Sequence, residues 1–360
     1  MVAVRDMFSK DLLSATKRVV GLDVGSSLIK LVEIRDSKQR FQLKNYAQIS
    51  VPPGIIVDGV VKDETALSER IKELFKNSKC GLKHVVSALS GHTVIIKKVN
   101  FAMMNEEELR ELLSDEAENY LPFDDVSEVN FDFYVIGENE LNPNQMEVII
   151  TAAKKEIIES CTRIIERAGR RVAIVDVDSF ALETAYNENY DFSDDEIVAL
   201  VHMGASITNI NIVKGGGSVF TRNFSLGGNS ITEAVQKKLQ VPFEEAERIK
   251  IEKKEDNGIS PEELIIYAEP IFAEIERSVD YFSSTFMDPF IKKILVSGGC
   301  AKIPGIVEAI EERLRCEAEL FDPFQNIGYD KKVFKNSFIT DIGPTAVLGV
   351  GLALRRMDDK

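Results

Sequence analysis

The first clear pattern of apolar and polar positions lies near the N-terminus. Residues 19–24 form an apolar, partly β-branched run that contains Asp23, a Gly-Ser-Ser triplet at 25–27 ends it, and residues 28–34 form a second largely apolar run that contains Lys30. The pattern predicts two buried strands joined by a tight turn. Small residues in such a turn direct backbone N–H groups toward one point, as in nests that hold phosphate. No helix follows and the GxxxxGK[ST] spacing is missing, so the stretch is not a P-loop. By itself it is equally compatible with a structural hairpin.

Residues 198–213 repeat this pattern at a constant offset from residues 19–34. The equivalent positions pair Gly204 with Gly25, Ala205 with Ser26, Ser206 with Ser27 and His202 with Asp23. Two such hairpins in one chain indicate two related lobes, each with a phosphate-binding turn. We expect a ligand to bind in the cleft between the lobes.

The remaining periodicities predict an alternation of strands and helices. Before the second hairpin these are a strand at 41–51, a helix at 64–79, two strands within 85–99, a helix capped by Asn105 and ending at Tyr120, paired strands at 130–137 and 146–153, a helix at 154–168, a strand at 171–177 and a helix at 178–187. After it come helices at 230–239 and from Pro242, a helical stretch at 261–286 kinked at Pro270, a buried strand at 291–297, and a helix that Gly343-Pro344 opens and that ends at Arg355.

Composition narrows the possible classes of protein. A chain of 360 residues with 44% hydrophobic and 29% charged residues suits about two globular domains. The net charge of -15 argues against nucleic acid as a partner. The four cysteines form no CxxC pair and there are only three histidines, which argues against a zinc centre. No apolar run is expected to cross a membrane. Residues 1–18 form an N-terminal extension, either a packed terminal helix or a helix that binds a membrane surface or a partner.

Several short motifs, in this order, resemble the actin/Hsp70/FtsA ATPase superfamily over nearly the whole chain. They are DVGSS with Lys30, HMGAS, GGN before a helix, AERIK and SGGCAKIPG. Within that superfamily, GLDVGSSLIKLVEI, DVDSFALETAY, FSLGGNSIT and GVGLALRR are similar to the PilM family, cytoplasmic actin-like proteins of type IV pilus assembly.

The resemblance implies an α/β fold of the actin-like ATPase type, with two duplicated lobes around a nucleotide cleft and an FtsA-like inserted subdomain. The implied ranges are 1–18 for the N-terminal extension, 19–84 with 171–197 and 335–360 for the first lobe (1A), 85–170 for the inserted subdomain (1C-like), and 198–334 for the second lobe (2A/2B).

The resemblance also implies ATP and Mg²⁺ as cofactors, with a role for each motif residue. Lys30 would contact the β- and γ-phosphates, Asp23 would hold Mg²⁺ through water, and Asp178 would orient an attacking water. The remaining cofactor-binding residues are Gly25, Ser26, Ser27, Gly204, Ala205 and Ser206 for phosphate, and Gly227, Gly228, Glu247, Lys250, Gly298, Gly299 and Lys302 for the rest of the nucleotide.

Ordinary structural roles stay open for several of these residues. Lys30 also suits an edge strand, and Asp178 also suits a helix cap. Glu247 and Lys250 have the spacing of an ordinary i,i+3 helix pair. His202 stands where the superfamily has an aspartate, and a neutral imidazole supplies no negative charge. We therefore expect nucleotide binding with weak or absent hydrolysis.

The implied partner is the N-terminal cytoplasmic tail of PilN, beside other proteins of the pilus assembly platform. The chain would be a cytoplasmic scaffold peripheral to the inner membrane, associated with it mainly through its partner, with its oligomeric state open. Thr93–Val99 and Asn105–Tyr120 are candidate walls of the partner groove. The alternative is an FtsA-like cell-division tether that polymerises with ATP. It would need a linker and an amphipathic C-terminal helix, which the residues after Leu354 are not expected to provide.

Overall fold

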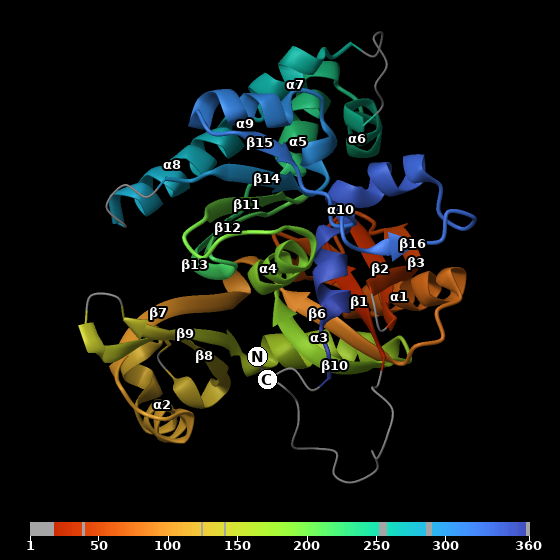
Figure 1. Ribbon diagram of the computed structural model, residues 1–360. Helices are drawn as coiled ribbons and strands as arrows, with labels where there is room; N and C mark the ends of the chain where they lie inside the picture. The colour runs from red at the N-terminus through yellow and green to blue at the C-terminus, as the bar shows by residue number, and fades with distance from the viewer. Residues whose placement is uncertain are drawn as a thin grey trace.

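The computed structural model describes residues 18–37, 40–123, 125–139, 142–251, 258–285 and 290–357. The expected N-terminal extension lies, except for Arg18, outside the described residues. Two large sheets face each other across a pair of central helices, and a small three-stranded sheet lies to one side (Figure 1).

The first sheet contains the first predicted hairpin. Its strand order is β10-β6-β1-β2-β3-β16, formed by β10 (Arg171–Val177), β6 (His84–Leu89), β1 (Val19–Val24), β2 (Leu28–Ser37), β3 (Arg40–Ser50) and β16 (Gly328–Tyr329). Helices α1 (Glu64–Ser78) and α3 (Lys155–Arg167) cover its outer face, where their apolar residues share one core with β1 and β2. A short hairpin, β4 (Ile56–Val57) and β5 (Val60–Val61), precedes α1.

The second sheet repeats the arrangement of the first. Its order is β13-β12-β11-β14-β15, formed by β13 (Gly217–Phe224), β12 (Thr208–Lys214), β11 (Ile197–Met203), β14 (Lys293–Ser297) and β15 (Ala318–Leu320). In each sheet one hairpin strand pairs antiparallel with the next strand in the chain and parallel with a later one. The predicted duplication is thus confirmed at the level of topology. The outer side carries α5 (Gly228–Leu239), α6 (Phe243–Ile251), α7 (Pro261–Tyr267), α8 (Glu269–Thr285), η3 (Cys300–Lys302) and α9 (Ile306–Leu314).

Helices α4 (Asp178–Asn189) and α10 (Asn336–Leu354) lie between the two sheets (Figure 1). They cross so closely that a Cβ placed on Gly351 would lie 1.8 Å from the carbonyl oxygen of Ala181. On the other side of α10, a Cβ on Gly21 of β1 would lie 2.4 Å from the carbonyl oxygen of Gly349. The glycines therefore allow one helix to pack tightly against both a helix and a strand.

Helix α10 corrects two sequence expectations. It begins at Asn336 rather than at Gly343-Pro344, because burial of almost the whole helix outweighs the one hydrogen bond that an internal proline removes. By length and composition α10 alone in the described chain could cross a membrane, contrary to expectation, but 78% of its most apolar window is buried inside the protein. A helix packed on all sides is apolar all round.

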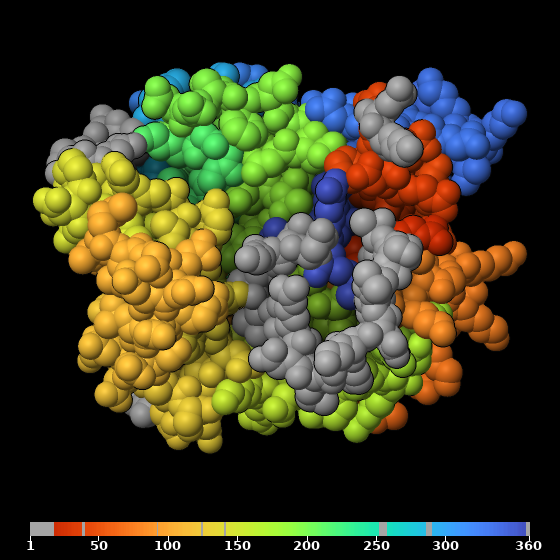
Figure 2. Space-filling view, turned by 60° about the horizontal axis from the view of Figure 1, so that its bottom comes forward, coloured from red at the N-terminus to blue at the C-terminus, as the bar shows by residue number. Residues whose placement is uncertain are grey.

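The small sheet has the order β7-β9-β8, formed by β7 (Val94–Ala102), β9 (Asn142–Lys154) and β8 (Val129–Asn139). The short η1 (Gly91–Thr93) leads into β7, and η2 (Val126–Glu128) into β8. Helix α2 (Glu106–Tyr120) begins with the predicted Asn105 cap, which Glu108 completes as a capping box. Figure 2 shows this subdomain in orange and yellow as a block at one side of the molecule.

The expected ranges differ from the observed sheets at three points. Strand β6 and helix α3 belong to the first sheet and its outer core, so the separate sheet spans 94–154 rather than 85–170. Residues 328–329 join the first sheet, although 198–334 was assigned to the second lobe. The helical stretch from 261 breaks at Ala268, before Pro270, since proline suits the first turn of a helix.

Candidate functional site

The two hairpin turns are closed in the same way. The N–H of Gly25 donates to the carbonyl oxygen of Leu28 at 3.1 Å, and that of Gly204 to the carbonyl oxygen of Ile207 at 3.0 Å. A Cβ on Gly25 would lie 3.0 Å from that first carbonyl oxygen, and one on Gly204 would lie 2.8 Å from the second. Glycine is therefore favoured at the same position of both turns because the chain folds back closely upon it.

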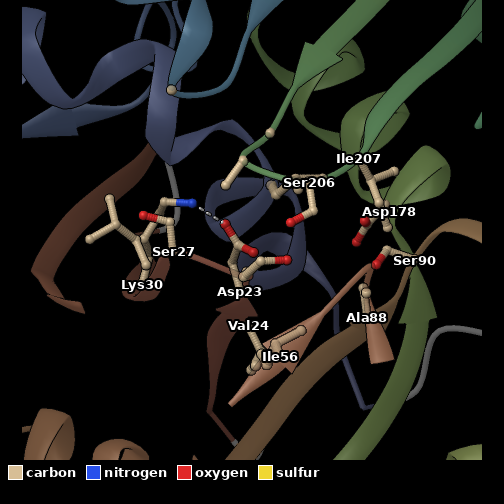
Figure 3. A pocket seen from close by; sticks show the side chains of 18 of the residues that line it. Asp23, Val24, Ser27, Lys30, Ile56, Ala88, Ser90, Asp178, Ser206 and Ile207 are labelled. Carbon is tan, nitrogen blue, oxygen red and sulfur yellow. Dashed lines mark hydrogen bonds and ion pairs between the residues drawn. The ribbon is translucent and has the colours of Figure 1, made fainter. Parts of the chain in front are cut away.

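Both turns open into one cleft of about 1140 Å³. Figure 3 shows Lys30 and Ser27 on one side of Asp23, with Ser206 and Asp178 on the other. Most of the predicted site residues line this cleft: Asp23, Gly25, Ser26, Ser27, Lys30, Asp178, Gly204, Ala205, Ser206, Gly228, Glu247, Lys250, Gly299 and Lys302. Gly227 and Gly298 do not line it.

The turns carry backbone donors that have no acceptor in the described part of the chain. Four turn amides have no acceptor among the residues that the structure describes, those of Ser26, Ser27, Ala205 and Ser206. Unpaired N–H groups are rare in folded proteins unless water or a ligand satisfies them. Two pairs of such donors facing one cleft suit the oxygens of a phosphate chain.

Asp23 and Lys30 are cross-strand neighbours on β1 and β2 and form a buried ion pair. The Nζ of Lys30 lies 2.7 Å from Oδ2 of Asp23 (Figure 3). Within the described chain this is the single hydrogen bond of either side chain, so Asp23 keeps one free oxygen and Lys30 keeps free N–H donors. The pair can therefore offer a cation to phosphate and a carboxylate oxygen to a metal-bound water.

Asp178 begins α4 and is half-buried at the cleft wall. Its carboxyl has no hydrogen bond or ion pair with another described residue. Burial raises the pKa of its carboxyl well above the ordinary value, and the negative charges of Asp23 and Asp176 raise it further. A carboxyl that is free, faces the cleft and binds a proton readily can orient water there.

His202 and Asn209 occupy, in the second hairpin, the positions that Asp23 and Lys30 occupy in the first. Burial lowers the pKa of His202 to about 4, and the positive charge of Lys30 acts in the same direction. Nδ1 of His202 lies 2.9 Å from the Ser297 hydroxyl. The second hairpin therefore carries a neutral pair where the first carries charges.

Asn209 is a cleft residue that the sequence analysis missed. Its Nδ2 donates to the Ser179 hydroxyl at 3.0 Å and to Asn223, whereas its buried Oδ1 has no partner in the described chain. Extending the comparison of the two hairpins beyond the turns would have found it, because it stands where the first hairpin has Lys30.

The start of α5 supports the second turn. The N–H groups of Gly228 and Asn229 donate to the carbonyl oxygens of Gly204 and Ala205 at 2.9 and 2.7 Å. The side chain of Asn229 also donates to the Ser206 hydroxyl at 3.0 Å. A Cβ on Gly227 would lie 2.6 Å from the Gly204 carbonyl oxygen, so this glycine acts through packing rather than in the cleft.

Lys250 stabilises the start of α5, and its ammonium donors are already bonded within the protein. Its buried Nζ contacts the Gly228 carbonyl oxygen at 3.0 Å, the Thr232 hydroxyl at 2.8 Å and Oε2 of Glu247 at 2.6 Å. These contacts occupy the three N–H donors of an ammonium group. The predicted i,i+3 pair with Glu247 therefore exists, and Glu247 remains the member that is partly exposed to the cleft.

The glycines after β14 have different roles. Gly298 has φ +91°, and a Cβ there would lie 2.2 Å from the Met203 carbonyl oxygen, so it is needed for backbone packing. Gly299 is exposed, and its Cβ would have no atom within 4 Å. Two other residues follow these glycines in η3. Lys302 forms an ion pair with Asp341 of α10 at 2.6 Å. Burial raises the pKa of the Cys300 thiol to about 11, which keeps this thiol protonated.

The donor set can be compared with the needs of Mg²⁺ and a nucleotide. No group of three or more His, Cys, Asp or Glu side chains that could hold a metal occurs in the described chain. Mg²⁺ usually binds one or two carboxylates, waters and substrate phosphates rather than a full protein cage. Asp23 with its free oxygen, beside four free amides, fits that requirement.

Comparisons with known proteins agree with this geometry. The fold, with two duplicated lobes around a cleft, is that of the actin-like ATPases. The family model of the type IV pilus assembly protein PilM matches residues 21–357, and the chain belongs to that family.

Individual relatives show the same likeness. A solved PilM–PilN type IV pilus biogenesis complex contains a chain that matches with a TM-score of 0.81 and 25% identity, over 95% of this chain and 99% of that one. The ethanolamine utilization protein EutJ from Carboxydothermus hydrogenoformans shares the fold, with a TM-score of 0.55 and 18% identity over 93% and 88% of the two chains. The cell division protein FtsA of Enterococcus hirae is 24% identical in an alignment of 369 positions that covers 90% of this chain and 82% of that protein.

Proposed function

We propose that this protein binds ATP with Mg²⁺ between its two hairpin turns and serves as a nucleotide-binding scaffold in type IV pilus assembly. The observation that carries the proposal is the pair of equivalent turns whose four free amides face one cleft. A phosphate chain placed between them would contact both lobes. Binding energy from both sides would then favour a closed arrangement of the lobes.

The residues around the turns supply the rest of the nucleotide site. Lys30, which is paired with Asp23, would add a positive charge for the terminal phosphates, and the other oxygen of Asp23 would hold water bound to Mg²⁺. Gly299 leaves open space for a flat ring, and the partly exposed carboxylate of Glu247 suits a ribose hydroxyl. Lys302 lies at the cleft edge, where its pair with Asp341 links η3 to α10.

The same site is poorly equipped for hydrolysis. The second hairpin carries His202 in place of a carboxylate that could hold water or metal. The lowered pKa of His202 keeps its imidazole neutral at physiological pH, so it supplies no charge there. Asp178 remains as the carboxyl that can orient an attacking water. Since phosphoryl transfer depends on positioning and charge stabilisation, we expect binding to persist and turnover to be slow.

A bulky residue at Gly299 tests the nucleotide site without disturbing the core. Gly299→Leu places a side chain in the open space of the cleft, and Gly81→Leu does so at an exposed glycine outside it. Neither position has positive φ or an atom within 4 Å of the added Cβ, so the two variants are matched in strain. Calorimetric titration with Mg²⁺ and ATP should show at least a ~10-fold loss of affinity for Gly299→Leu, about 1.4 kcal/mol. Equal affinities for the two variants would contradict the site.

For the partner, we propose the N-terminal cytoplasmic tail of PilN; the likeness to a chain of a solved PilM–PilN complex supports PilN as the partner. This would place the protein in the cytoplasm, peripheral to the inner membrane. The cleft continues from the turns into a chamber between β4–β5, α1 and α3, with apolar walls that include Ile56, Leu67, Ile71, Ile157 and Ile164. Thr93, one of the expected groove residues, lines the cavity, whereas no residue of α2 does.

The chamber can be tested with a peptide of the PilN tail. Ile157→Lys puts a charge into the chamber wall, and Ile266→Lys puts one on the exposed face of α7 as a control. Fluorescence anisotropy should show weaker peptide binding for Ile157→Lys, by at least ~10-fold, and no change for Ile266→Lys. Unchanged binding by both variants would place the peptide elsewhere.

A further inference from the structure

The residue that ends the second turn reaches across the cleft into the first lobe. Ile207 packs against two glycines there, since its Cδ1 would lie 2.6 Å from a Cβ on Gly59 and 2.8 Å from one on Gly91. Figure 3 shows Ile207 at the cleft wall beside Ser90 and Asp178. A side chain at either glycine would therefore occupy the space of the isoleucine.

Each glycine belongs to a different loop of the first lobe. Gly59 (φ +76°) follows Asp58 (φ +50°) in the turn between β4 and β5, a conformation that suits an Asp-Gly pair. Gly91 (φ +62°) begins η1, which leads directly into β7 of the three-stranded sheet. The Ile207 side chain thus contacts both the β4–β5 hairpin and the segment that leads into the inserted subdomain.

A second contact connects the second lobe to the same place. Nδ2 of Asn223 on β13 lies 3.4 Å from the Gly91 carbonyl oxygen. The oxygen of Asn223 accepts from Asn209, which lines the cleft. Gly91 is therefore held by an apolar contact from Ile207, at the end of the second turn, and by a polar contact from Asn223, on the β13 strand that pairs with β12.

Ile207 belongs to the same hydrogen-bonded turn as the amides that we propose bind phosphate. The carbonyl oxygen of Ile207 accepts from the N–H of Gly204, so the free amides of Ala205 and Ser206 lie within the loop that this bond closes. A ligand that draws these amides toward the first lobe must carry Ile207 with them. Interfaces of this kind are packed or unpacked rather than continuously deformed.

We propose that Ile207 is a positioning residue that couples ligand binding at the second turn to the β4–β5 turn and to the start of the inserted subdomain. The inference rests on the proposed function, in which a nucleotide bridges the two turns. Because closure and the Ile207 contact favour the same arrangement, occupancy of the nucleotide site stabilises both first-lobe loops. These loops adjoin the proposed peptide chamber, so nucleotide binding would reach the partner site by this route.

Hydrogen exchange can measure the coupling with one variant and one matched control. Ile207→Ala removes the contact but keeps every turn amide. Ile265→Ala removes a half-buried isoleucine that packs against another positive-φ glycine, Gly305, inside the second lobe. Exchange is recorded for peptides covering 55–62 and 90–102, without ligand and with Mg²⁺ and a non-hydrolysable ATP analogue at saturating concentration. Occupancy of each variant is confirmed by calorimetry.

In the wild type and in Ile265→Ala, the analogue should slow exchange in both loops by about tenfold, which corresponds to about 1.4 kcal/mol. In Ile207→Ala this ligand-dependent protection should disappear, while protection at 204–207 remains. Without ligand, Ile207→Ala should exchange faster than the wild type in both loops. Retention of full ligand-dependent protection by Ile207→Ala would overturn the coupling.

The two proposals fail in different ways. If the wild type binds no analogue, the nucleotide site is wrong, and the ligand-free comparison alone decides whether Ile207 holds the two loops. If the analogue binds but Ile207→Ala behaves like Ile265→Ala, the nucleotide site stands and the role of Ile207 is wrong.

Discussion

The buried histidine of the second hairpin makes a quantitative prediction about stability and pH. Burial and the charge of Lys30 lower the pKa of His202 from 6.5 to about 4 in the folded protein. In the unfolded chain His202 takes up a proton near pH 6.5, so the unfolded state binds more protons between pH 6.5 and pH 4. The free energy of unfolding therefore falls as the pH is lowered through this window. The difference between these two pKa values corresponds to about 3 kcal/mol in full, of which about 2 kcal/mol is lost between pH 7 and pH 5.

The test compares the ligand-free wild type with His202→Gln, which cannot titrate. Urea unfolding at pH 7 and pH 5 gives the loss of stability for each protein, and the difference between the two losses isolates His202, since the other groups are common to both. We expect the wild type to lose about 2 kcal/mol more than the variant. NMR titration of the imidazole signals, assigned with the variant, checks the pKa directly. A His202 signal that titrates near pH 6.5, or equal losses in the two proteins, would refute the argument.

Three further predictions concern the cleft and the central helices. Asp178→Asn should lower the residual rate of ATP hydrolysis by ~100-fold in single-turnover assays while leaving ATP affinity within about threefold, because it removes a proton acceptor; an unchanged rate would exclude Asp178 as the water-orienting group. Lys250→Met should weaken ATP binding by about tenfold in calorimetry, because the start of α5 loses its bonds to the ammonium group; full affinity would show that the second turn needs no such support. Gly351→Ala should destabilise the protein by about 3 kcal/mol in urea unfolding, because the added Cβ would lie 1.8 Å from the Ala181 carbonyl oxygen. A stability equal to that of the wild type would mean that α4 and α10 can move apart without any loss of stability.

Local patterns in the sequence predicted most elements well. The bounds of β1 and β10 and the Asn105 cap of α2 agree with the structure, because alternation, length and cap chemistry are properties of a few neighbouring residues. The start of α10 was missed because burial against two sheets overrode the local signal of Pro344. The range of the inserted subdomain was also displaced, since the sheet that β6 joins depends on distant strands.

The candidate site shows the same division. Repetition of the hairpin pattern was sufficient to predict two turns that face one cleft, because the repeat specifies both turns and the lobes that carry them. Which ammonium group stays available was not predictable. Among the described residues Lys30 keeps free donors while those of Lys250 are all engaged, and the difference depends on atoms that α5 contributes.

The sequence by itself thus determined the paired turns, their glycines and the missing carboxylate at His202. Only the tertiary structure decided that the donors of Lys250 are all engaged, that Gly298 acts through packing, and that Ile207 lies between two glycines of the other lobe. The physical reason is that turn chemistry and strand periodicity act over a few residues, whereas contacts across the cleft depend on how the two sheets are placed around α4 and α10.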